Sequence, residues 1–66
     1  MIITINGNPE EVKMQSSLAE LILKKGLCMD HLVIEHNYCI VSKQECQNIS
    51  LKENDTIEIV SFVGGG

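Results

Sequence analysis

Residues 17–26, Ser-Leu-Ala-Glu-Leu-Ile-Leu-Lys-Lys-Gly, carry the clearest local structural signal in the chain. Ser17 and Glu20 have the spacing of a capping box, in which each side chain accepts a hydrogen bond from the other residue's backbone amide. Two lysines then occupy the last turn, where the helix dipole favours cations, and Gly26 suits the position just past the end. The stretch predicts an amphipathic helix of about ten residues, whose apolar face is Leu18, Leu21 and Ile22.

A β-hairpin is predicted before this helix. Residues 1–6 alternate between two faces, with Met1, Ile3 and Ile5 on one of them. Asn6-Gly7-Asn8-Pro9 is a strong turn signal, because Asn-Gly readily adopts the positive φ angles of a tight hairpin. Residues 10–14 can then pair back, and we expect Val12 and Met14 to face inward.

Several short strands are predicted after the helix. Residues 32–35 carry apolar side chains on both faces, which favours a central strand. Asn37-Tyr38 can turn the chain into a short strand at 39–42, and the polar stretch 43–48 predicts a helical turn or a loop. Residues 49–51 could form a brief edge strand, followed by a turn in which Asn54 takes the left-handed conformation.

The last predicted strand spans residues 56–63, with Ile57, Ile59 and Ser61 on one face and Glu58, Val60 and Phe62 on the other. A hairpin, a helix and a closing strand together indicate an α+β fold, the β-grasp (ubiquitin-like) arrangement, with one main helix packed on one face of a mixed sheet. In that arrangement the last strand lies beside the first, in the centre of the sheet. We therefore expect a single domain at 1–63 and a flexible glycine tail at 64–66.

Composition excludes several classes of function. The chain has 66 residues, a net charge of −4 and no arginine, which argues against binding to nucleic acid or to an anionic membrane. The sequence shows neither a signal peptide nor a membrane-length apolar run, so a cytoplasmic protein is expected. Three irregularly spaced cysteines predict buried, reduced thiols rather than a disulfide framework or a zinc site; they are Cys28, Cys39 and Cys46. His31 and His36 are expected to be solvated or to cap an element.

The three glycines that follow the last strand suggest a chemistry. Glycine fits channels that no other residue can thread, and three extended residues reach roughly 10 Å. The Gly66 carboxylate could therefore enter the active site of another protein and be activated there as an acyl-adenylate with ATP. Sulfur or a thiol could then take the acyl group, so that the domain needs no catalytic residue of its own. The competing interpretation is a frayed end or an expression remnant, but the glycines directly follow a well-patterned strand.

The whole chain resembles the ThiS family, the ubiquitin-like sulfur carriers of thiamine biosynthesis. The stretches that carry the resemblance are 2–7, 17–22, 33–37 and, most specifically, 51–66. The family usually has glycine where Asn54 stands, and Tyr38-Cys39 is unusual at its position. The resemblance implies that an E1-like adenylating enzyme uses ATP and magnesium on Gly66, while the domain itself binds no cofactor.

The same resemblance implies the later steps and the partners. Sulfur from cysteine, delivered by a desulfurase, would convert Gly66 into a thiocarboxylate, and thiazole synthase would take that sulfur. Gly64 and Gly65 would thread the channels. Beside the tail, Phe62, Val60 and Val63 are candidates for partner docking, although Phe62 could instead complete a minor core. Alternatives are the small subunit of molybdopterin synthase, a ubiquitin-like modifier of lysines, and a plain interaction module.

Overall fold

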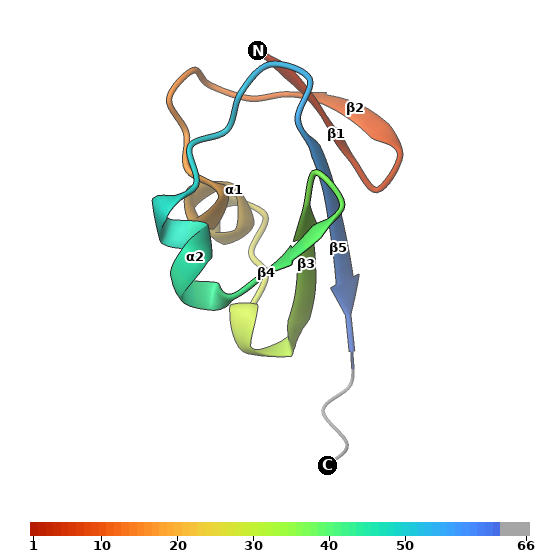
Figure 1. Ribbon diagram of the computed structural model, residues 1–66, viewed down its shortest axis with the longest axis vertical. Coiled ribbons are helices and arrows are strands. Elements are labelled where there is room, and N and C mark those ends of the chain that lie inside the picture. The colour runs from red at the N-terminus through yellow and green to blue at the C-terminus, as the bar shows by residue number, and fades with distance from the viewer. Residues whose placement is uncertain (63–66) are drawn as a thin grey trace.

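The computed structural model describes residues 1–62 and contains a five-stranded mixed sheet covered on one face by helices (Figure 1). The strand order is β2-β1-β5-β3-β4; β1 and β5 are parallel, and the other neighbours are antiparallel. This is the predicted β-grasp arrangement, with the last strand in the centre. In chain order the elements are β1 (Ile2–Ile5), β2 (Asn8–Glu11), α1 (Leu18–Lys24), a 3₁₀ turn (Met29–His31), β3 (Leu32–His36), β4 (Cys39–Val41), α2 (Lys43–Asn48) and β5 (Thr56–Ser61).

The first hairpin turns at Asn6 and Gly7, whose φ angles of 50° and 83° confirm the predicted tight turn. The second strand begins earlier than expected, because a two-residue loop places Asn8 directly opposite Ile5. The inward orientation expected for Met14 was wrong: its side chain is 73% exposed, since the chain leaves the sheet after Glu11. Val12 does pack partly against the core.

Helix α1 begins with the predicted capping box. The Glu20 amide donates to the Ser17 hydroxyl at 3.1 Å, and the Ser17 amide donates to the Glu20 carboxylate at 3.1 Å. The helix itself has seven residues, fewer than expected, because Ser17 and Lys25 are its caps and Gly26 follows at φ 74°. Its three apolar residues are buried as predicted.

The second half of the chain confirms the central position of β3 and the helical alternative for residues 43–48, and it differs from expectation in other details. Strand β3 has a neighbour on each side, yet Val33 is 40% exposed, because the helices cover only one face of the sheet. Residues 43–48 form helix α2, whose start carries a second capping box, Ser42 with Glu45, that the sequence reading missed. The edge strand expected at 49–51 was wrong, since Ser50 makes only an isolated bridge to Ser17.

The core lies between the sheet and the helices. Asn54 has the expected left-handed conformation, with φ 71°, and turns the chain into β5. On β5 the alternation is as predicted: Ile57 and Ile59 are buried, while Val60 is exposed. The buried apolar residues are Ile3, Ile5, Leu18, Leu21, Ile22, Ile34, Cys46, Leu51, Ile57 and Ile59.

Candidate functional site

The candidate site lies where β5 ends. Gly66 was predicted to carry sulfur, Gly64 and Gly65 to thread the partner's channel, and Val63 to dock beside them. All four residues lie outside the described part of the chain. The structure does place the strand that leads to them. Strand β5 starts between β1 and β3, and its pairing with β3 continues to Ser61, so the last described part of the strand is anchored to the sheet through β3.

Phe62 and Val60 lie on the surface at this end of β5. Val60 is 59% exposed and Phe62 is 45% exposed, so neither is a fully buried core residue. The Phe62 amide donates to the His31 carbonyl at 3.0 Å, and the two rings meet edge to face with centroids 6.4 Å apart. This contact holds the Phe62 backbone and one side of its ring, while the rest of the ring faces solvent. The docking role of both residues remains a prediction.

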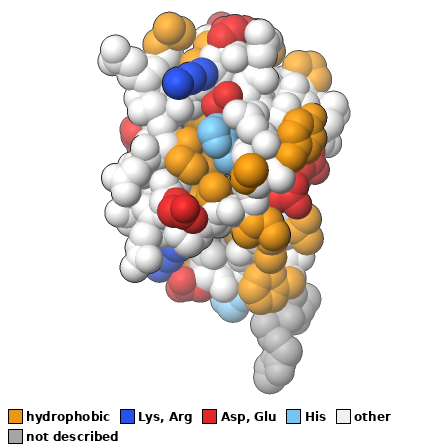
Figure 2. All heavy atoms as spheres, in the orientation of Figure 1, with side chains coloured by type: hydrophobic (Ala, Val, Ile, Leu, Met, Phe, Trp, Pro, Cys, Tyr) orange, Lys and Arg blue, Asp and Glu red, His pale blue; other side chains and the backbone are white. Residues whose placement is uncertain are grey.

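The exposed apolar surface extends to β3 and β4. Val33 lies directly opposite Val60, and Ile40 lies opposite Glu35 on the same face, so that Ile40 is a diagonal neighbour of Val33. Figure 2 shows hydrophobic side chains gathered toward this end of the molecule. We call the set Val33, Ile40, Val60 and Phe62 the open-face patch. Sequence reasoning missed its β3 and β4 members, because a short apolar run does not reveal which of its faces is covered.

Two carboxylates border the open-face patch. Glu35 and Glu58 are directly opposite each other on β3 and β5, and both are half-buried. Like charges in that position lower the stability of a sheet. Among residues 1–62 neither has a cationic partner within 4.0 Å, since the ion pairs are Lys25–Glu10, His36–Asp55 and Lys43–Asp30. The patch is therefore apolar with a negative border.

His36 has a structural role that its sequence position did not reveal. Its Nε2 lies 2.9 Å from Oδ2 of Asp55, a buried carboxylate that also accepts from the Lys52 amide at 2.9 Å and from the Asn37 side chain at 3.2 Å. Burial alone would raise the pKa of Asp55, but these hydrogen bonds and the nearby His36 together lower it. The solvated or capping role expected for His36 was therefore wrong: it ties the end of β3 to the start of β5.

The three thiols do not share one environment. Cys46 is buried in the core, and burial, followed by the charge of Glu45, raises the pKa of its thiol. Cys28 and Cys39 are exposed, so the expectation of three buried thiols was wrong for these two, which lie outside the helix-covered core. In the described part of the chain no three His, Cys, Asp or Glu side chains gather as a metal site would require.

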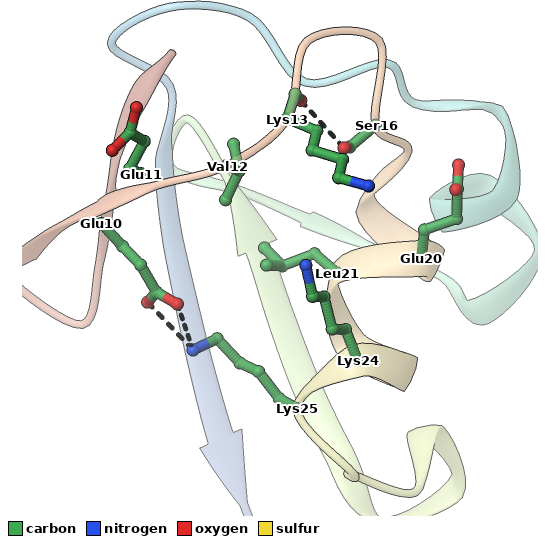
Figure 3. A pocket seen from close by; sticks show the side chains of 9 residues that line it. All are labelled: Glu10, Glu11, Val12, Lys13, Ser16, Glu20, Leu21, Lys24 and Lys25. Atoms are coloured by element: carbon green, nitrogen blue, oxygen red, sulfur yellow. Dashed lines mark hydrogen bonds and ion pairs between the residues drawn. The ribbon is translucent and has the colours of Figure 1, made fainter.

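A surface groove lies between β2 and α1, and charged side chains that line it take part in an ion pair and in a helix cap (Figure 3). Lys25 Nζ lies 2.8 Å from the Glu10 carboxylate across the groove, and the Glu20 carboxylate caps α1. No reactive constellation emerges from it. Among residues 1–62, no helix has the length and apolar character needed to cross a membrane.

The known proteins that are similar to this chain differ in length and in name. A protein of Magnetococcus marinus named "Thiazole synthase" is 33% identical over 66 residues, but the chain spans only 20% of its length. The protein of Bacillus subtilis named "Sulfur carrier protein ThiS" is 30% identical, and the match covers 98% of this chain and 100% of that protein.

The fold has a solved counterpart. The crystal structure of the thiamine biosynthesis protein ThiS from Geobacter metallireducens superimposes with a TM-score of 0.84 at 25% identity, covering 100% of both chains. The model of the ThiS family matches residues 3–66, almost the whole sequence. On the strength of these matches and of the β-grasp sheet that ends in β5, the chain belongs to the ThiS family.

Proposed function

We propose that this chain is a protein sulfur carrier of thiamine biosynthesis and not itself an enzyme. The observation that carries the proposal is the match along the full length of the Bacillus subtilis sulfur carrier. The Geobacter metallireducens structure, which is named for the same pathway, adds agreement of the whole fold.

Gly66 is proposed to be the residue that carries sulfur. Its carboxylate would attack the α-phosphorus of ATP on an E1-like enzyme that uses magnesium, which forms an acyl-adenylate and releases pyrophosphate. A persulfide that a desulfurase forms with sulfur from cysteine would then displace AMP and give an acyl disulfide. A thiol would reduce that disulfide, which releases the thiocarboxylate and leaves the thiol in a new disulfide. Gly64 and Gly65 would thread the active-site channels, because a residue without Cβ needs the least room. The proposal requires Gly66 to carry a free carboxylate.

Thiazole synthase is the proposed acceptor of the sulfur. Support comes from relatives of that name, in which a segment matching all of this chain forms 20% of a longer protein. Physical linkage of a carrier-like segment to the synthase is expected if the two work together. The open-face patch, together with Val63, would dock on the partner enzymes, and its negative border would favour a partner surface with basic residues at the matching rim.

Intact mass measurement tests the carrier chemistry. The purified chain is incubated with the E1-like enzyme of its own genome, ATP, magnesium and a sulfur source. We expect the mass to rise by the difference between one sulfur and one oxygen atom, and we expect no change in a variant that lacks Gly66. An unchanged wild-type mass, with an activating enzyme shown to be competent on another carrier, would contradict the proposal.

The pathway needs a separate experiment. The gene is introduced into one strain that cannot make thiamine because it lacks its own carrier, and into another that lacks the small subunit of molybdopterin synthase. Rescue of the thiamine-requiring strain is expected. Growth of only the second strain would leave the carrier chemistry intact and remove the thiamine assignment.

A further inference from the structure

Strand β5 has an incompletely paired edge near its end. On the side of β1, β5 is paired at only two positions, Thr4 with Thr56 and Ile5 with Ile57, because β1 turns away at Asn6. On the other side, pairing with β3 continues to Ser61. Figure 1 shows β3 on one side of the later part of β5 and no described strand on its other side.

The direction of each backbone group in β5 follows from the hydrogen bonds. Thr56 and Phe62 bond to the β3 side, since the Asn37 amide donates to Thr56 at 2.8 Å and the Phe62 amide donates to His31 at 3.0 Å. In an antiparallel pair the hydrogen-bonded positions alternate, so residues 57, 59 and 61 present their amides and carbonyls to the opposite side. The Asn6 amide confirms this, because it donates to the Ile57 carbonyl at 2.9 Å.

The Asn6 side chain pairs with the next residue on this edge, Ile59. Its Nδ2 donates to the Ile59 carbonyl at 3.1 Å, and its Oδ1 accepts from the Ile59 amide at 2.7 Å. The side chain thus replaces one residue of a neighbouring strand. Ser61 is the next position on this edge; it is exposed, and within residues 1–62 neither its N–H nor its C=O has a backbone or side-chain partner.

Resting on the proposed function, the geometry points to strand addition: an extended segment of thiazole synthase pairs with β5 at the Ser61 edge. A backbone donor and acceptor side by side on one edge match another extended backbone, which is the general mode of binding at an open sheet edge. The Asn6 bridge closes the edge at Ile59, so the added strand would pair with the backbone groups of Ser61. Val60 and Phe62 would then lie within reach of its side chains.

Thiazole synthase is preferred as the occupant, because two relatives with that name contain a segment that matches the whole length of this chain. In those relatives the covalent linkage gives the contact a high effective concentration, so a short added strand would suffice there. A strand this short also fits a transient contact better than a permanent one. It presents too little open edge to drive aggregation of the free protein.

Amide hydrogen exchange of the intact chain tests the inference directly. In the free protein the Ser61 amide should exchange rapidly and the Phe62 amide slowly, because only the latter is bonded. In the complex with thiazole synthase we expect exchange at Ser61 to slow by at least about tenfold while Phe62 changes little. A synthase complex in which Ser61 still exchanges rapidly would overturn the inference. Slow exchange of the Ser61 amide in the free chain at high concentration would also overturn the inference. Slow exchange that appears only in the complex with the activating enzyme would overturn it as well.

A matched pair of variants adds an affinity measurement. Ser61→Pro removes the outward N–H and no internal hydrogen bond, whereas Ser61→Ala keeps the N–H. We expect the proline variant alone to bind thiazole synthase about 5- to 100-fold more weakly, because the facing carbonyl loses its partner. Urea unfolding of both variants identifies any loss due to misfolding. Equal binding by both folded variants would refute strand addition. Failure of the wild-type chain to bind the synthase at all would instead contradict the proposed function.

Discussion

Replacing Phe62 with alanine separates docking from folding. The Phe62 side chain is 45% exposed and its buried part contacts His31. Full burial of a phenylalanine contributes about 1.5–3 kcal/mol, so roughly half of that, about 1 kcal/mol, supports the free domain. The hydrogen bond to the His31 carbonyl uses the Phe62 backbone and survives the substitution. Unfolding should therefore remain cooperative, with a modest loss of stability.

The exposed part of the ring is what a partner would cover. Its burial would contribute about 1 kcal/mol or slightly more by the same reasoning, which corresponds to a dissociation constant about 5- to 10-fold higher for Phe62→Ala. The truncation also leaves a gap in the complex, so the upper part of this range is expected.

Titration calorimetry with the activating enzyme and with thiazole synthase measures this effect, and urea unfolding measures stability. Leu23→Ala is the matched control, because Leu23 is 69% exposed on α1 and does not belong to the open-face patch. The control should change neither affinity. Affinities of Phe62→Ala equal to wild type for both partners would refute the docking role, and loss of cooperative unfolding would show that Phe62 is a core residue.

Three further predictions concern the folded domain. Asp55→Asn should lower the free energy of unfolding by about 1–3 kcal/mol at pH 7, as measured in urea. Because the folded-state pKa of Asp55 is lowered, its stabilising contribution is present above about pH 4 and is lost as the pH falls through that lowered pKa. The stabilities of the variant and the wild type should therefore converge in acid. Ile22→Ala, at a fully buried position, should destabilise the domain by about 2–5 kcal/mol in the same assay. A thiol reagent should modify Cys28 and Cys39 in the native protein but Cys46 only after unfolding; rapid labelling of all three would contradict the burial of Cys46.

Local signals predicted the elements whose hydrogen bonds are themselves local. The Ser17–Glu20 capping box and the Asn6-Gly7 turn each specify geometry within four residues, and both occur as expected. The same reasoning, applied to Ser42 and Glu45, would have predicted where α2 begins. That signal was present but was overlooked, because the segment lacks an apolar stripe and buries only one cysteine.

Properties set by distant contacts could not be obtained in this way. The contact of His36 with Asp55 requires the end of β3 to meet the turn before β5, 19 residues later. The exposure of Val33 depends on helices covering one face only, which an apolar run does not encode. Strand alternation alone predicts that Phe62 and Val60 lie on the face opposite Ile57 and Ile59. Which residues of β3 and β4 lie beside them depends on the register of strand pairing, which the sequence does not give.

The distribution of unfavourable features indicates what the open face is for. On the helix-covered side, both helices are capped and the core is filled by apolar side chains. On the other face, Glu35 opposes Glu58, and neither forms an ion pair with a cationic side chain of the described residues, while Val33 and Val60 remain exposed. Replacing either glutamate with a lysine would relieve the repulsion, so folding alone does not explain the arrangement. Features that lower stability persist where a function needs them. A partner surface with basic side chains at its rim would turn both features into favourable contacts, beside the strand that leads to Gly66.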